Sequence, residues 1–133
     1  MEDLKKLTGE LGISESVVFT GNVKHEDVFT YISLMDVTVL PRTSWYMSPI
    51  KIFEYGAMGK AIVAPDNAPV KDVMVHEKDG VLIEPNAEAI GQAILRLYKD
   101  GDLRKRVATQ FQQKVCSTYT WENTARRILE GFI

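Results

Sequence analysis

The chain has 133 residues, of which 45% are hydrophobic and 26% are charged, so it fits one domain of ordinary size with a packed core and excludes disorder. Its net charge of -2 excludes a broad basic field for nucleic acid or an anionic membrane. The one cysteine, Cys116, excludes an internal disulfide and a cysteine zinc cluster, and no apolar run approaches the roughly 20 residues of a membrane-spanning helix.

Helical periods and short apolar runs alternate along the chain. Helices are predicted over 2–11, 26–35, 49–58, 87–99, 102–118 and 121–132, with a helical turn over 69–75. Strands are predicted over 17–20, 37–40, 61–64 and 81–83. Because the strands are apolar on both faces, we predict an α/β fold with an open parallel sheet and helices on both faces.

The predicted sheet looks incomplete at its start. Four strands make a narrow sheet, and the chain opens on a helix with no strand before it to anchor a first crossover. With no linker in the sequence, residues 1–133 are expected to form a single domain that begins inside a larger fold.

The segment SPIKIFEYGAMGKAIVAP, residues 48–65, carries the residues suited to chemistry. Ser48 is a good N-cap and Pro49 suits the first position of a helix. Lys51 stands in the first turn, where a cation opposes the helix dipole at a cost of about 0.3–1 kcal/mol, and an anion bound at the helix end removes that cost. Backbone N–H groups, the dipole and the ammonium group together suit a phosphate.

Glu54 lies one turn further along and shares a helix face with Lys51. Its carboxylate can accept two hydrogen bonds from the vicinal hydroxyls of a ribose, so the pattern suits a nucleotide diphosphate lying across the helix start. The alternative is an ordinary surface helix in which Lys51 pairs with Glu54. Spacing alone leaves both interpretations open.

The same segment closely resembles the donor-site segment of the retaining glycosyltransferases of family 4 (group 1), whose fold is the two-domain GT-B type. That family commonly shows Ser-Pro-x-Lys-x-Phe-Glu-Tyr-x-Ala-x-Gly-Lys-Pro at this place. The segments VVFTGNV, DVTVLPRT, KDVMVHEKDGVLIEPN and the closing helices are also similar to family segments, so the resemblance covers nearly the whole chain. It implies a Rossmann-like, nucleotide-sugar-binding C-terminal domain, truncated at its N-terminus.

The resemblance also implies a donor site for a sugar carried on UDP or GDP. Glu54 should hold the ribose, and the helix start and the loop before it should line the diphosphate and sugar, through Ser48, Pro49, Ile50, Lys51, Thr43, Ser44 and Tyr46. The family often has a second glutamate eight positions before the ribose-binding one. Tyr46 stands there in this chain, which leaves the donor sugar open. No cofactor or metal is implied, and no catalytic residue is identified.

Relatives carry an upstream Gly-Arg…Lys-Gly stretch, whose cations neutralise the diphosphate leaving group, and an N-terminal acceptor domain. Neither is in this sequence. Because electrostatic stabilisation is the largest catalytic term in such a reaction, we expect the chain to be the inactive donor-side part of a longer hexosyltransferase of glycan or polysaccharide biosynthesis. Its partners would be the nucleotide sugar and the acceptor domain. We expect a cytoplasmic protein, with peripheral contact to the inner face of a membrane left open.

Two non-enzymatic functions are kept as alternatives: an α/β binding module and a partner-docking domain. Trp45 and Tyr46 could stack on a ligand or pack on a missing domain. His25 is expected to take part in helix capping, Trp121 and Phe111 to pack in the core, and the run 104–106 to be a solvated helix face.

Overall fold

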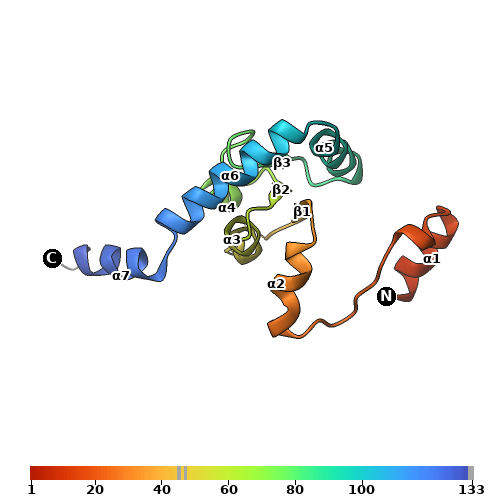
Figure 1. Cartoon of the computed structure of the whole chain (residues 1–133), viewed down its shortest axis with the longest axis horizontal. Coiled ribbons are helices and arrows are strands. Elements are labelled where there is room, and N and C mark those ends of the chain that lie inside the picture. Colours follow the sequence, from red (N-terminus) through yellow and green to blue (C-terminus); the bar gives the residue numbers. More distant parts are fainter. Residues whose placement is uncertain (45, 47, 132–133) are drawn as a thin grey trace.

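The computed structural model describes residues 1–44, 46 and 48–131, so the predicted roles of Trp45 lie outside the described residues (Figure 1). The helices are α1 (Glu2–Glu10), α2 (His25–Ser33), α3 (Ile50–Ala57), α4 (Ala68–Lys71), α5 (Ala87–Lys99), α6 (Gly101–Thr118) and α7 (Trp121–Glu130), with a 3-10 turn, η1, at Ser14–Ser16. The strands are β1 (Val37–Val39), β2 (Ala61–Pro65) and β3 (Val81–Ile83).

The three strands form one parallel sheet in the order β1-β2-β3. Val37 of β1 lies opposite Ala61 of β2, and Val63 of β2 lies opposite Val81 of β3. Beyond β1 the ladder continues, because the Leu40 N–H donates to the Val63 carbonyl at 2.8 Å. All three strands therefore point their carboxyl ends toward the same edge of the sheet.

The predicted strand over 17–20 is wrong. The structure assigns these residues no strand, and the side chain of Val18 is 84% exposed. A parallel strand is stable only beside a neighbour that pairs its backbone, and no described segment pairs with this one. Figure 1 shows the segment as an extended connection between α1 and α2, with α1 lying apart from the sheet.

Helices cover both faces of the sheet, as predicted. Along β2, Ile62 and Ala64 point to one face and Ala61 and Val63 to the other, and all four are buried. The first face packs on side chains of α3, α4 and the second half of α6, which include Phe111. The second face packs on α5 and the first half of α6. The long α6 thus joins both halves of the core.

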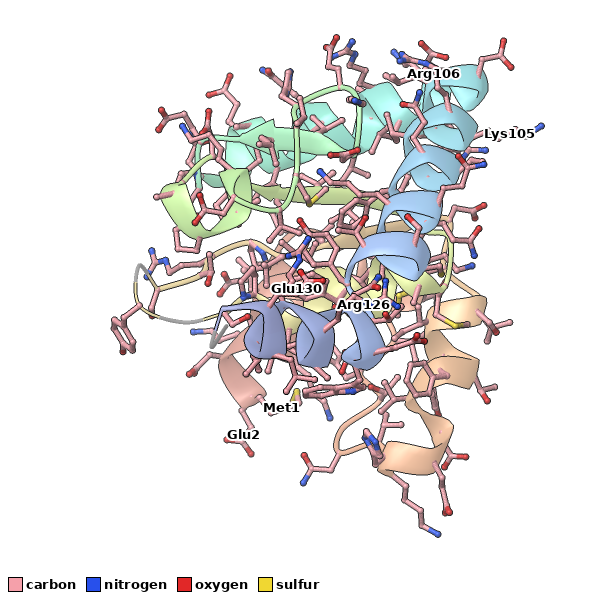
Figure 2. All side chains as sticks on the ribbon, turned by 90° about the vertical axis from the view of Figure 1, so that its left-hand side faces the viewer. Met1, Glu2, Lys105, Arg106, Arg126 and Glu130 are labelled. Carbon is pink, nitrogen blue, oxygen red and sulfur yellow. The ribbon has the colours of Figure 1, made fainter. Side chains whose placement is uncertain are left out.

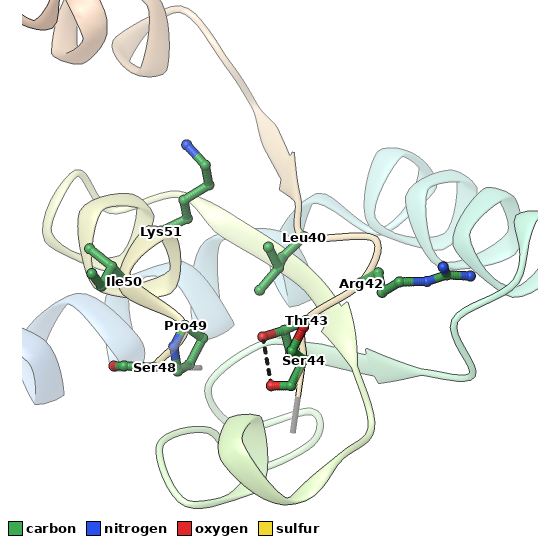
Figure 3. Close-up of a pocket in the computed structure, with 8 residues that line it drawn as sticks. All are labelled: Leu40, Arg42, Thr43, Ser44, Ser48, Pro49, Ile50 and Lys51. Carbon is green, nitrogen blue, oxygen red and sulfur yellow. Dashed lines mark hydrogen bonds between the residues drawn. The ribbon is translucent and has the colours of Figure 1, made fainter. Parts of the chain in front are cut away.

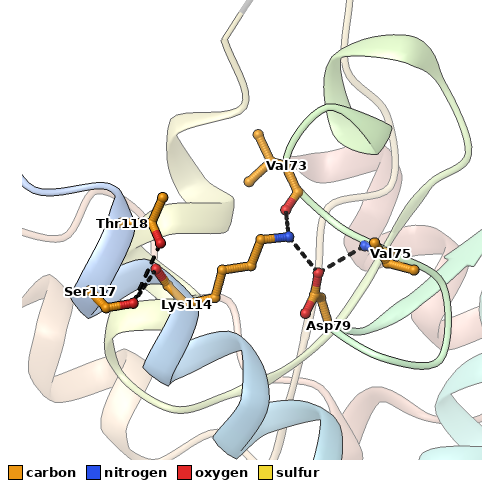
Figure 4. A network of polar contacts seen from close by, with 6 residues as sticks. All are labelled: Val73, Val75, Asp79, Lys114, Ser117 and Thr118. Atoms are coloured by element: carbon orange, nitrogen blue, oxygen red, sulfur yellow. Dashed lines mark hydrogen bonds and ion pairs between the residues drawn. The ribbon is translucent and has the colours of Figure 1, made fainter. Parts of the chain in front are cut away.

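An ion pair between the buried Asp79 and the partly exposed Lys114 fixes α6 to the turn that precedes β3 (Figure 4). The Asp79 side chain is 2% exposed, and its Oδ2 accepts from Lys114 Nζ at 2.7 Å and from the Val75 N–H at 3.0 Å. Lys114 Nζ also donates to the Val73 carbonyl at 2.7 Å. The carboxylate therefore has a counter-charge and a backbone donor, which a buried charge requires.

The basic run 104–106 lies on α6, as expected for a helix face. Lys105 and Arg106 are exposed, and Figure 2 shows both at the outer side of the molecule. Arg104 is partly buried and donates to the carbonyls of Leu97 and Tyr98 at the end of α5. It therefore satisfies carbonyls that the helix itself leaves unpaired.

Two side-chain predictions are wrong. Trp121 is not in the core, since its side chain is 90% exposed and α7 has no buried residue. The reason is that α7 continues beyond the end of α6, away from the sheet (Figure 1). His25 provides no cap, because Lys24 is the N-cap of α2 and makes no side-chain cap bond. The His25 ring instead lies edge-on to Phe29. Phe111 is buried in the core, as predicted.

None of the helices in the described part of the chain combines the length and apolarity that crossing a bilayer requires.

Candidate ligand-binding site at the start of helix α3

The loop between β1 and α3 leaves the carboxyl edge of the sheet, where parallel sheets bind ligands. Helix α3 begins one residue later than predicted, so Pro49 is the N-cap and not the first helical residue. The prediction that Ser48 caps the helix is wrong, because no side chain caps α3. Backbone carbonyls serve instead: the Ile50 N–H donates to the Ser48 carbonyl and the Ile52 N–H to the Pro49 carbonyl, both at 2.9 Å.

A cavity of about 400 Å³ lies at this helix start (Figure 3). Its lining unites six of the eight residues predicted from the sequence, namely Thr43, Ser44, Ser48, Pro49, Ile50 and Lys51. Within the loop, the Thr43 hydroxyl donates to the Ser44 carbonyl at 3.4 Å. Tyr46 does not line the cavity, and its side chain is 70% exposed on the same loop.

Glu54 lines a second cavity, of about 180 Å³, together with Lys51 and Tyr55 of α3. Its other walls come from α2 and the segment before it, and include the apolar side chains of Val23 and Ile32. Glu54 is only partly buried, so its carboxylate is accessible from this cavity. Lys51 lines both cavities, which makes it the link between the helix start and Glu54.

The side chains of Lys51 and Glu54 form no ion pair within the described residues. The structure therefore does not support the alternative of an ordinary surface pair. Burial of the phenol, followed by the charge of Glu54, raises the pKa of Tyr55 above its usual value of 10.0. Tyr55 thus stays a neutral hydroxyl beside the carboxylate throughout the physiological pH range.

Sequence reasoning missed two residues of the larger cavity, Leu40 and Arg42. Leu40 directly precedes Pro41 and Arg42 directly follows it, just beyond the carboxyl end of β1. That position was the available signal, since residues just beyond parallel strands face the ligand edge of the sheet. Among the described residues, no group of three histidine, cysteine or acidic side chains could hold a metal ion.

Comparison with known proteins gives this site a context. The family model for glycosyl transferases group 1 matches residues 1–114. The alpha-D-kanosaminyltransferase of Streptomyces kanamyceticus is 33% identical over 107 residues, which are 80% of this chain and 28% of that protein. The GDP-mannose-dependent alpha-(1-6)-phosphatidylinositol monomannoside mannosyltransferase of Mycobacterium tuberculosis is 22% identical over 98% of this chain and 36% of its own length.

The fold agrees with that match. The crystal structure of Anabaena HepE in complex with UDP superimposes with a TM-score of 0.89 at 19% identity, covering 98% of this chain and 36% of that one. The chain therefore has the Rossmann-like fold of a GT-B domain, as predicted, and spans about a third of the length of these proteins. Since the family model matches residues 1–114 and thus most of the chain, the protein belongs to the glycosyl transferases group 1 family.

Proposed function

We propose that the chain is the donor-binding part of a retaining glycosyltransferase, and that it binds a sugar carried on UDP or GDP at the start of α3. The observation that carries this proposal is the position of Lys51, which lines both the cavity at the helix start and the cavity that contains Glu54. A diphosphate in the first cavity would lie within reach of the ammonium group. The ribose would then extend toward Glu54, whose carboxylate can accept hydrogen bonds from its two hydroxyls.

The chemistry of the lining suits this assignment. Hydroxyl groups of Thr43, Ser44 and Ser48 line the larger cavity and can donate to phosphate or sugar oxygens. HepE was solved with UDP, and the mycobacterial relative is named for its use of GDP-mannose. These names support a nucleotide diphosphate as the ligand class. The retaining outcome and a role in polysaccharide biosynthesis rest on the family resemblance. We also propose a cytoplasmic setting and a single-domain organisation, which rest on the sequence itself.

Titration of the 133-residue chain tests the binding function. UDP-glucose and GDP-mannose are added separately while backbone amide chemical shifts are followed. We expect perturbation around Lys51 and Glu54 for at least one nucleotide. Glu54→Gln should weaken binding by about tenfold, because it removes a charged acceptor from the ribose hydroxyls. Glu15→Gln, on the exposed turn η1, is the matched control and should bind like the wild type. Absence of any perturbation by either nucleotide would refute the donor site.

We further propose that this chain alone does not transfer the sugar. Its relatives are about three times longer, so groups that bind the acceptor and stabilise the leaving diphosphate are proposed to lie in the part that this chain does not span. A transfer assay with radiolabelled donor and a mixture of candidate acceptors checks this. Transfer by the purified chain above the rate of a Glu54→Gln sample would contradict it.

A partner-docking function is the second candidate, and helix α7 favours it. Trp121, Ile128 and Leu129 of this helix are 90%, 54% and 66% exposed, which is unusual for large apolar side chains on one helix. Trp121 also lines a cavity of about 500 Å³ with Phe53 and Tyr119, next to Ser48 and Ile50 at the start of α3. A docking module that is not an enzyme would leave all nucleotides without effect in the titration above.

A further inference from the structure

We propose that Arg42 is a second phosphate-binding cation of this site and acts with Lys51 on the diphosphate of the donor. The inference rests on the proposed donor function, which it deepens by naming a second residue of this chain that would contact the diphosphate. Arg42 and Lys51 both line the 400 Å³ cavity, one from the loop after β1 and the other from α3. Figure 3 shows the two side chains projecting from opposite sides of the group that lines the cavity.

The side chains that line the cavity are positively charged in sum, whereas the whole chain is negatively charged. The whole chain has a net charge of -2, yet the eight residues that line the cavity include two cations and no carboxylate. Three further lining residues, Thr43, Ser44 and Ser48, carry hydroxyl groups. Cations together with hydroxyl donors form a lining that suits a doubly charged phosphate chain.

Arg42 is available for such a contact. Four of the other arginines have partners: Arg96 and Arg106 bind Glu77, Arg104 binds carbonyls at the end of α5, and Arg126 pairs with Glu122. Within the described residues, Arg42 makes no side-chain hydrogen bond or ion pair and its side chain is exposed. A guanidinium with no partner beside a cavity can bind phosphate oxygens with two parallel N–H groups.

The orientation of the Arg42 side chain in the structure determines which movement phosphate binding would require. In Figure 3 the guanidinium of Arg42 points away from the start of α3. Rotation about the side-chain torsions of an exposed arginine encounters only the small barriers between staggered rotamers. Pro41 restricts the backbone next to Arg42, and the Leu40 N–H is paired with the Val63 carbonyl of β2, so the movement that binding requires is a rotation of the Arg42 side chain.

The test compares phosphate-bearing and phosphate-free probes. Binding of UDP, uridine, GDP, guanosine and inorganic pyrophosphate to the 133-residue chain is measured by calorimetry at two salt concentrations. Arg42→Gln should weaken the binding of pyrophosphate and of the nucleoside diphosphate about tenfold, as expected for a charge-assisted hydrogen bond, and should reduce the salt dependence. Affinity for the nucleoside should not change. Arg42→Lys should restore part of the loss, because it keeps the charge without the planar fork.

Arg127→Gln is the matched control, since Arg127 is also an exposed arginine without a described partner but lies on α7. It should bind every probe like the wild type. Equal weakening by Arg42→Gln and Arg127→Gln, or no weakening by Arg42→Gln, overturns the role of Arg42 while leaving the donor site intact. Pyrophosphate binding that depends on Arg42, without any nucleotide binding, supports Arg42 and refutes the donor function. Failure of the wild type to bind any probe refutes both.

Discussion

At the scale of single residues, mutation can test how much the ion pair between Asp79 and Lys114 contributes to stability. Lys114→Met would leave the Asp79 carboxylate, which is 2% exposed, without its counter-charge. Removing Lys114 leaves the buried carboxylate without a counter-charge, and because the Lys114 side chain is partly exposed we expect a loss of about 1–3 kcal/mol in the free energy of unfolding, between the values of exposed and buried pairs. Urea unfolding followed by circular dichroism measures it.

The control for this variant is Lys105→Met on the exposed side of the same helix, which should change stability by less than about 0.5 kcal/mol. The double variant Asp79→Asn, Lys114→Met removes both charges. We expect it to be more stable than Lys114→Met alone, because the buried carboxylate is gone. If the double variant loses as much free energy of unfolding as the single variants Asp79→Asn and Lys114→Met lose together, the two side chains act independently.

Glu77 provides a prediction about pH. The hydrogen bond from Arg96, followed by its positive charge, lowers the pKa of Glu77 below its usual value of 4.5. A carboxyl whose pKa is lower in the folded than in the unfolded chain stabilises the fold above the unfolded pKa, and this contribution is lost as pH falls through the folded pKa. Arg96→Met should therefore raise the pKa of Glu77 toward 4.5 and diminish the acid-induced loss of stability.

Carboxyl-carbon chemical shifts recorded during an acid titration measure this pKa directly. Arg127→Met removes an arginine that has no contact with Glu77 and should leave the titration unchanged. A Glu77 titration that is the same in the Arg96→Met variant and the wild type would refute the assignment of Arg96 as the cause.

At the scale of elements, the position of α3, which carries the candidate site, depends on how closely this helix packs against α6. A methyl group at Gly56 would come within 2.6 Å of Phe111 Cε1 and 2.9 Å of Val115 Cγ2. Gly56→Ala should therefore force the two helices apart and destabilise the fold by about 1–3 kcal/mol. Gly91→Ala on α5, where no atom lies within 4 Å, is the matched control and should stabilise the fold by about 0.5–1 kcal/mol. Equal effects of the two variants would contradict close helix packing.

The limits of sequence-based prediction can be seen in particular elements. The predicted bounds of helix α5 agree with the observed Ala87–Lys99, and the structure shows that the Asn86 side chain caps this helix by accepting from the Ala89 N–H, a signal that is local in the sequence. The segment 17–20 has the same apolar character as β2, but a strand also needs a neighbour, and apolar character does not reveal one. The prediction that Trp121 is buried is wrong for a related reason. A helical period shows which face of α7 is apolar, but not whether another element covers it.

The candidate site shows the same distinction. The motif from Ser48 to Glu54 placed Lys51 and Glu54 on one face of a helix, and both line cavities in the structure. The cap of α3 was predicted one residue too early, because a Ser-Pro pair does not specify which of the two residues first has helical dihedral angles. Arg42 was missed because it lies outside the motif and is brought to the cavity only by the path of the loop.

At the scale of the whole molecule, the core and the C-terminal helix α7 should respond differently to truncation of large apolar side chains. Phe111 is fully buried where α3, α4 and α6 meet the sheet, whereas Trp121 of α7 is 90% exposed. Phe111→Ala should lower the free energy of unfolding by about 3–5 kcal/mol through the cavity that it creates. Trp121→Ala should change it by less than about 0.5 kcal/mol, since it removes no core contact. Urea denaturation of both variants measures the difference, and a loss above about 2 kcal/mol for Trp121→Ala would mean that α7 packs on the body of the chain in solution.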